Sequence, residues 1–331
     1  MKMKQLLYLV LLFLSLSRLH AQDAHLSLYD AAPLHLNPAM TGVFQGSWRL
    51  HGQYRTQWKA VNFKPYTQGL VSFDMPFKKW GFGIQLANFR AGIGNYNAFQ
   101  GLLSVAYTTP IDKNKNHNFS FGVQGGIVQK SVEYQLLSFN NQYTTTNGGE
   151  FDMTVNPNES IGGQSLITPS LNAGFLYFFA KQESRLNPFV GISAFNLLEP
   201  KESFTNFDNR LPMRFYGHIG TRINITEVLY VIPKVLFMQQ RKFNEQTYAA
   251  DIGYYMKGSD IYLLGGIIYR NKDAMIVSLG ARMNGFVVKV GYDVNVSSLA
   301  SSSTGRGGLE LSLTYIHEKK KSVSDKICPR L

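Results

Sequence analysis

Apolar and polar side chains alternate with a period of two residues along most of this chain. The clearest case lies near the C-terminus, where Leu309, Leu311, Leu313 and Tyr315 alternate with Glu310, Ser312 and Thr314. Residues 286–295 follow the same rhythm. Successive side chains of a β-strand point to opposite faces, so each such segment predicts a strand with one apolar face and one polar or small face.

Fourteen segments of about 8 to 12 residues have this strand composition and are bounded by Gly, Asn, Asp, Pro or Lys. They centre on 46–55, 66–75, 80–89, 97–108, 117–128, 170–180, 187–197, 213–224, 227–238, 246–257, 260–269, 274–283, 285–295 and 307–317. After Ala21 no apolar run reaches the roughly 18 to 20 residues of a membrane-spanning helix. An even number of antiparallel strands is typical of outer-membrane barrels, and lipid permits no open sheet edge. The pattern predicts an all-β, transmembrane, antiparallel up-and-down β-barrel over residues 46–317.

The connections between these segments alternate in length. If the chain enters from the periplasm, even-numbered connections lie on the periplasmic side and odd-numbered connections lie outside the cell. Four even connections are short, 76–79, 224–227, 257–260 and 283–285, and two are longer, 109–116 and 181–186. The odd ones include 56–65, 198–212, 296–306 and about 129–169. A loop as long as 129–169 is unusual inside a compact soluble domain. We therefore expect short periplasmic turns and longer extracellular loops.

The first 21 residues have the composition of a secretory signal peptide. Lys2 and Lys4 precede an apolar run from Leu6 to Leu16, and small or polar residues follow as far as Ala21. Cleavage is expected after Ala21, although the large Leu19 leaves room for a shifted position. Cleavage would remove three basic residues and lower the formal charge of the chain from +12 to +9. An exported chain with this strand pattern belongs in the bacterial cell outer membrane.

The composition supports a surface that faces lipid. Aromatic residues make up 13% of the chain and charged residues only 16%, against about 25% in an ordinary soluble domain. Few charges and many aromatic residues suit a barrel wall between two aromatic belts. Cys328 is the single cysteine, so no disulfide within the chain supports the fold.

Charged residues fall on the strand faces opposite the apolar ones. A charged side chain on the lipid face near the midplane costs about 2–4 kcal/mol, so we expect these residues to face the lumen. The expected lumen cations are Arg49, Arg55, Arg214, Arg222, Arg282 and Lys289, with Asp251, Asp293 and Glu310 as their carboxylate partners. This set of charged residues has two interpretations. The residues are simply solvated in a water-filled interior, or they line a plug or a pore. Pro233 predicts a bulge or a rim position, and 260–269 is apolar on both faces.

Sequence patterns for catalysis and for cofactor binding are not found. The sequence has no His-Glu-x-x-His, no phosphate-binding glycine loop followed by Lys-Ser/Thr, and no cysteine pair for zinc. We therefore expect no enzyme activity, no cofactor and no metal. Because Lys and Arg are dispersed and the chain is exported, anionic lipid head groups or acidic partners fit the positive charge better than nucleic acid.

Two short sequences carry a resemblance to a known family. Asn37-Pro38-Ala39-Met40-Thr41-Gly42 follows the signal peptide, and Tyr54-Arg55-Thr56-Gln57-Trp58 ends the first predicted strand. With an aromatic barrel of this length and a basic tail, they make the chain similar to the PorP/SprF family of the type IX secretion system, from about residue 27 to Leu331. The resemblance implies a non-enzymatic outer-membrane component of a secretion and gliding apparatus. It also implies partners among the periplasmic secretion components and, in some members, a secreted adhesin or cargo with a C-terminal sorting domain.

These motifs supply the candidate partner-binding or family-motif residues, which are Asn37, Pro38, Gly42, Tyr54, Arg55, Gln57, Trp58, Cys328 and Pro329. Segment 22–45 either enters the barrel as a plug or lies in the periplasm as a leader to the first strand. At the outer rim, Arg55 and Trp58 form an aromatic anchor or, less favoured, a recognition surface. The basic tail 318–331 is expected to be a periplasmic docking peptide.

Two other functions are weighed against this one. The first is a fourteen-stranded outer-membrane channel or transporter for small or hydrophobic compounds, which a steady single-channel current through the isolated protein would favour. The second is an outer-membrane hydrolase, which is disfavoured because its Ser and His would lie side by side on the outer wall rather than in the lumen.

Overall fold

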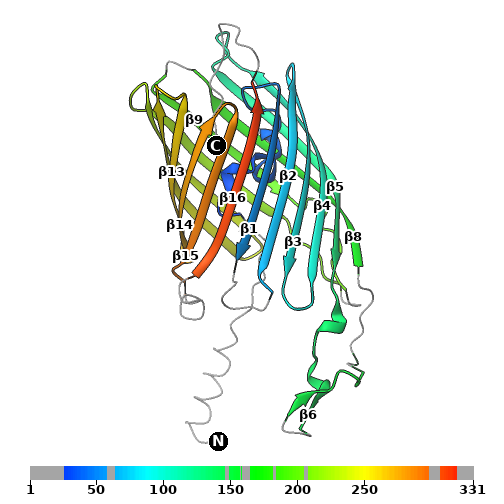
Figure 1. Cartoon of the computed structure of the whole chain (residues 1–331). Helices are drawn as coiled ribbons and strands as arrows, with labels where there is room; N and C mark the ends of the chain where they lie inside the picture. The colour runs from blue at the N-terminus through cyan, green and yellow to red at the C-terminus, as the bar shows by residue number, and fades with distance from the viewer. Residues whose placement is uncertain are drawn as a thin grey trace, which may run out of the picture.

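The computed structural model describes residues 26–57, 64–145, 149–156, 158, 165–181, 184–204, 208–297 and 306–318. In this part of the chain, fourteen strands form one closed antiparallel barrel (Figure 1). Each barrel strand pairs with the next one in sequence, and the first, β1, pairs with the last, β16. The predicted fold class is confirmed. The signal peptide predicted for residues 1–21 lies outside the described residues.

The strands match the predicted segments closely. The barrel strands are β1 (Trp48–Gln57), β2 (Tyr66–Phe77), β3 (Trp80–Ala91), β4 (Tyr96–Pro110), β5 (His117–Ser131), β8 (Ser165–Phe179), β9 (Leu186–Phe195), β10 (Arg214–Asn224), β11 (Leu229–Gln240), β12 (Phe243–Met256), β13 (Ile261–Arg270), β14 (Ala274–Met283), β15 (Phe286–Asn295) and β16 (Arg306–His317). The connection predicted at 129–169 is shorter, 132–164, because β5 and β8 continue through polar residues such as Lys130 and Ser165. In these two strands, the alternation of apolar and polar side chains ends before the hydrogen-bonded pairing between β5 and β8 ends.

The two ends of the barrel differ. One end, here called the short-turn end, carries only short connections, such as β2 to β3 and β14 to β15; it is the upper end in Figure 1. The opposite, long-loop end carries the connections 58–65, 132–164, 196–213 and 296–305. It also carries three tight turns, at 92–95, 241–242 and 271–273, so the predicted alternation of lengths holds for one end only.

The longest connection at the long-loop end has its own small elements. They are η3 (Tyr134–Leu136), η4 (Asn140–Gln142), β6 (Tyr143–Thr144) and β7 (Glu150–Phe151). β6 and β7 pair as a two-stranded sheet that lies beyond the barrel wall, at the bottom of Figure 1. None of the helices in the described part of the chain is long and apolar enough to cross a membrane.

The predicted faces of the strands are confirmed. In β16, Leu309, Leu311 and Leu313 are about half exposed on the outer wall, whereas Glu310 is fully buried in the lumen. β15 alternates in the same way, with Val288 and Val290 outside. An apolar outer wall over a polar interior is the arrangement of a barrel whose solvent is lipid.

Aromatic residues gather on the outer wall near the short-turn end. The ring of Tyr315 lies 4.5 Å from that of Phe286 and 5.2 Å from that of Trp48, centroid to centroid. Trp80 and Tyr107 form a second pair at 4.9 Å. Tyrosine and tryptophan are favoured where the hydrocarbon meets the head groups, so these rings mark one membrane interface.

Two strands that fitted the pattern poorly have different explanations. Pro233 lies inside β11 and faces outward, and the β10–β11 register is the same before and after it; only the pairing opposite Ile232 and Pro233 is interrupted. The predicted bulge or rim position is therefore wrong. β13 is apolar on both faces because its inward side chain Ile268 packs in an apolar cluster with residues of the N-terminal segment, including Leu28.

Candidate functional site

The N-terminal segment, residues 26–45, lies inside the barrel and is called the plug here (Figure 1). It contains η1 (Tyr29–Ala31), α2 (Pro33–Leu36) and η2 (Pro38–Met40). Proline starts both α2 and η2, where a missing N–H group costs nothing. Such short helices leave many backbone groups without internal partners, so their stability depends on what the barrel wall supplies.

The start of the plug binds two carboxylates of the wall. The backbone N–H groups of Ser27 and Leu28 donate to Glu310, at 2.7 Å and 3.0 Å. The Ser27 hydroxyl donates to Asp293 at 2.6 Å, and Gln53 Nε2 donates to the Leu28 carbonyl at 3.1 Å. All of these groups are buried. The bonds to the carboxylates of Glu310 and Asp293 are charge-assisted, and they hold the first turn of the plug.

Arg55 lies in the same cluster and not at the outer rim. Its side chain is 1% exposed, and its guanidinium lies 2.7 Å from Asp293 and 3.5 Å from Glu310. Arg270 approaches Asp293 at 3.3 Å from the other side. The lumen pairing predicted for Arg55 is confirmed, and its alternative placement at the outer rim is wrong, because the two buried carboxylates require a cation beside them.

A second ionic cluster joins the plug to the opposite wall. Lys234 Nζ contacts the carboxylates of Asp30 and Asp251, and Lys289 Nζ lies 3.5 Å from both. Burial acts to raise the pKa of Asp30, but the positive charges of Lys234 and Lys289 outweigh it, so this pKa lies well below its usual value. The cluster has two cations and two carboxylates, and its charges balance.

Asn37 connects the plug to three barrel strands. Its Nδ2 donates to the carbonyls of Phe175 and Ile192, at 3.0 Å and 3.2 Å, and lies 3.2 Å from His218 Nε2. Its Oδ1 accepts from the Ala39 N–H at 2.9 Å and so caps η2. The side chain is fully buried and uses both ends of its amide, which a leucine or alanine could not do.

Glycines on the inner wall give the motif room to approach. A Cβ at Gly122 would clash with the backbone of Pro38, and a Cβ at Gly174 would clash with the Asn37 amide. A Cβ at Gly191 would clash with the His218 ring that faces the same amide. Three strands therefore carry glycine where the plug, or the His218 ring that contacts it, lies against the wall.

The motif ends at Gly42, near the short-turn end. Gly42 has φ +74°, and its N–H donates to Asp74 at 2.7 Å. Arg49 holds the same carboxylate through two bonds of 2.9 Å and 2.8 Å, and its guanidinium lies over the Phe44 ring. The positive φ favours glycine at this turn, which brings the chain out of the lumen toward β1.

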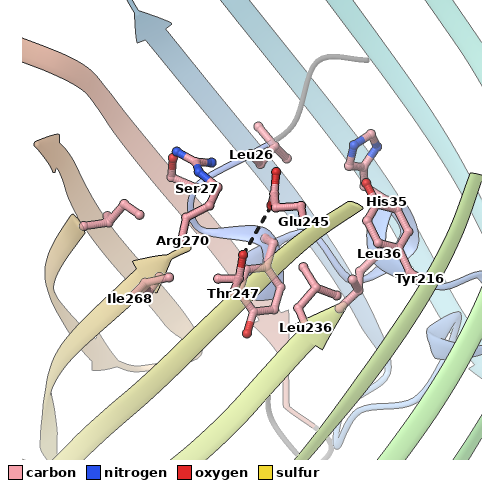
Figure 2. A pocket seen from close by; sticks show the side chains of 12 residues that line it. Leu26, Ser27, His35, Leu36, Tyr216, Leu236, Glu245, Thr247, Ile268 and Arg270 are labelled. Carbon is pink, nitrogen blue, oxygen red and sulfur yellow. Dashed lines mark hydrogen bonds between the residues drawn. The ribbon is translucent and has the colours of Figure 1, made fainter. Parts of the chain in front are cut away.

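A small pocket of about 20 Å³ lies beside the plug toward the long-loop end. Figure 2 shows Leu26 and His35 of the plug around it, facing Glu245 and Arg270 of the wall. The Thr247 hydroxyl donates to Glu245, two residues earlier in β12, at 3.2 Å. Its volume holds one or two water molecules, so it is an interstice of the packing and not a ligand site.

A larger cavity of about 110 Å³ lies on the other side of the plug, and is called the short-turn cavity here. The plug contributes Asp30, Met40 and Phe44 to its lining. The wall contributes basic and aromatic residues that include Arg49, Arg222, Arg282, Lys289, Tyr230 and Tyr262. Between the two cavities the plug fills the lumen with buried side chains.

The remaining motif residues are scattered. Tyr54 points outward and is 52% exposed, while Gln57 ends β1 and is half-buried. Trp58, Cys328 and Pro329 lie outside the described residues. The structure therefore brings together Asn37, Pro38 and Gly42 in the plug, with Arg55 in the cluster at its first turn.

Several residues that hold the plug were missed from the sequence. Asp30 and Asp74 carried a weak signal, since each is an isolated acid among apolar neighbours. The inward glycines, such as Gly122 and Gly174, carried none, because glycine is common throughout the strands. No group of three or more His, Cys, Asp or Glu side chains that could hold a metal ion is found among the described residues.

Comparison with known proteins identifies the family. The model of the type IX secretion system membrane protein PorP/SprF matches residues 19–315. The chain belongs to the PorP/SprF family. The curated proteins give no match. The barrel fold and the family both fit the bacterial outer membrane.

Solved structures share the fold of this PorP/SprF protein at very low identity. The CymD monoaromatic hydrocarbon channel has a TM-score of 0.51 at 10% identity, covering 88% of this chain and 94% of its own. The toluene transporter TbuX of Ralstonia pickettii has a TM-score of 0.51 at 8% identity, covering 86% and 93%. Likeness at this level of identity establishes the barrel fold alone.

Proposed function

We propose that this protein is a non-enzymatic component of the type IX secretion machinery in the outer membrane, where it helps to secrete or anchor surface proteins such as adhesins. The family match over residues 19–315 carries this proposal. A barrel whose lumen is filled by its own buried plug suits a scaffold for other proteins better than an open pore. The short-turn end would face the periplasm, as in other outer-membrane barrels.

Deletion of the gene in the native bacterium tests this function. We expect the loss, from the cell surface and the culture medium, of one or a few proteins that carry C-terminal sorting domains, measured by quantitative proteomics of both fractions. The wild-type gene restores them. An unchanged surface and secreted proteome in the deletion strain would contradict the proposal.

The partners on the periplasmic side are proposed to contact the basic tail. Residues 318–331 include Lys319, Lys320 and Lys321, and nothing in a closed barrel requires them. Deletion of residues 319–331 should reduce both secretion and the recovery of secretion components with a tagged barrel. Normal secretion together with normal recovery of partners would show that the partners do not depend on the basic tail.

A channel for small or hydrophobic compounds is the second candidate, because the fold is shared with CymD and TbuX. The two functions differ in conductance. We expect no steady ion current through the purified protein in a planar bilayer, and a current after deletion of residues 26–45. A steady current through the intact protein, together with uptake of toluene by cells that produce it, would favour the channel.

A further inference from the structure

The short-turn cavity holds more positive than negative charge. Its lining has four cationic side chains, Arg49, Arg222, Arg282 and Lys289, and two carboxylates, Asp30 and Asp251. Lys289 shares these two carboxylates with Lys234, and Arg49 is paired with Asp74 outside the lining. The excess positive charge of the cavity therefore comes from the remaining two arginines, Arg222 and Arg282.

Arg222 forms no ion pair with any of the described residues. Its Nε donates to the side-chain carbonyl of Asn224 at 3.0 Å, and its guanidinium lies 3.9 Å from the centroid of the Tyr230 ring. Gly253 leaves the space that the Tyr230 ring occupies. The stacking orients the guanidinium while leaving its terminal N–H groups available, which is how arginine presents itself to a planar anion.

Arg282 lies next to it. Its guanidinium is 5.4 Å from the Tyr262 ring, and the rings of Tyr262 and Tyr230 are 6.4 Å apart. Its only ion pair within the described residues is with Glu318, at 3.4 Å, and the Glu318 side chain is 59% exposed. A surface ion pair of this length is weak. Arg282 therefore binds a carboxylate here, and another carboxylate can readily replace Glu318.

The two arginines and their stacked tyrosines lie where a partner can contact them from the short-turn end of the barrel. Arg222 and Arg282 lie within two residues of the ends of β10 and β14, and Tyr230 and Tyr262 lie second in β11 and β13. All four are half-buried at the short-turn end of the lumen, with apolar side chains such as Phe44 and Ile316 beside them.

We propose that the short-turn cavity binds a carboxylate side chain of an acidic peptide, with Arg222 and Arg282 as the anion ligands and Phe44 and Ile316 against an adjoining apolar residue. The peptide would belong to a periplasmic partner, which rests on the function proposed above. The volume of about 110 Å³ suits one inserted side chain and is too small for a folded element. A lipid head group is disfavoured because these arginines face the lumen and lipid contacts the opposite face of the wall.

Calorimetric titration of the purified full-length protein in detergent tests this site. The probe is the blocked peptide acetyl-Gly-Phe-Glu-amide, and its Gln counterpart differs only in the carboxylate. We expect the Glu peptide to bind at least about tenfold more tightly than the Gln peptide, since bidentate arginine–carboxylate bonds are worth at least that factor. Glu318→Gln should strengthen binding two- to threefold by freeing Arg282.

The double variant R222Q/R282Q should weaken binding by at least about tenfold. R185Q/K257Q is the matched control, since Arg185 and Lys257 are exposed at the same end outside the cavity and the loss of charge is equal. Equal weakening in both double variants, equal binding of the two peptides, or competition by inorganic phosphate but not by glutarate would each overturn the carboxylate site. Secretion lost in the deletion strain with no binding in this assay would refute the cavity alone.

Discussion

Substitution of Asn37 by alanine should release the central part of the plug from the barrel wall. The wild-type amide donates to the carbonyls of Phe175 and Ile192, contacts His218, and accepts from the Ala39 N–H. Alanine removes all of these contacts and leaves a buried N–H and a buried imidazole nitrogen without that partner.

The magnitude follows from the number of bonds lost. At about 1 kcal/mol of net stability for each of three well-formed bonds, N37A should destabilise plug docking by about 3 kcal/mol. A loss of this size raises the population of undocked plug roughly 100-fold, because 1.4 kcal/mol corresponds to a factor of ten. The barrel ladder is not touched by the substitution, so the strands should keep their stability.

Hydrogen exchange measured by mass spectrometry reports this change directly. The amides of Met40, Thr41 and Val43 donate to carbonyls within the plug, and they exchange when the plug undocks. We expect protection of a peptide spanning 33–44 to fall roughly 100-fold in N37A, while peptides from β14 and β15 stay unchanged.

The matched control is N88A. Asn88 also bonds a neighbouring side chain, Asn97 at 2.8 Å, but on the outward side of the wall, away from the plug. Its substitution should leave exchange of 33–44 within about threefold of wild type. A change in plug exchange in N37A no larger than in this control, or an equal rise of exchange in the strands, would show that the Asn37 bonds do not hold the plug.

Three further perturbations address other contacts of the plug. G174A places a methyl group against the Asn37 amide and should raise exchange of 33–44 in the same way, whereas G217A, which has open space around it, should not. R55A leaves the buried Glu310 without a cation and Asp293 with Arg270 alone, and it should destabilise the protein by about 3–5 kcal/mol in chemical denaturation, against less than about 0.5 kcal/mol for substitution of the exposed Arg90. The folded-state pKa of Asp30 lies below its unfolded value of 3.8, so its ionised form stabilises the plug above that pH and the stabilisation is lost as the pH falls toward the folded pKa. The difference in melting temperature between wild type and D30N should therefore be constant from about pH 5 to 8 and shrink below about pH 4; a decrease between pH 6 and 8 would be inconsistent with this.

The barrel could be predicted from the sequence because the alternation of apolar and polar side chains repeats within each strand and depends only on neighbouring residues. Each strand exposes one face to lipid, so residues such as Leu309 and Leu311 must be apolar while Glu310 must face inward. The end of a strand is less certain, since β5 continues to Ser131 after the apolar rhythm has stopped. Pro233 misled the prediction because the loss of one ladder bond was tolerated without a shift of register.

The plug contacts could not be predicted in the same way, because they depend on pairs that are far apart in the chain. Nothing in the sequence pairs Ser27 with Glu310, or Asp30 with Lys234, until the barrel closes and brings β16 and β11 around the segment. The motif residues were recognised, but their surroundings were not. The Asn37 amide required three strands and their inward glycines to be in place.

The distribution of these contacts bears on whether the barrel conducts. The plug is held at its first turn by Glu310, at Asp30 by Lys234 and Lys289, in its middle by Asn37, and at its end by Asp74 through the Gly42 N–H. Release of one attachment leaves the other three, so a continuous pathway requires all four to be lost together. If each is worth even about 2 kcal/mol, their sum of about 8 kcal/mol keeps the open state below roughly one molecule in a hundred thousand. A barrel closed to that degree is a poor passive channel, whereas the same docked plug contributes Asp30, Met40 and Phe44 to the short-turn cavity, against which the proposed acidic peptide would bind.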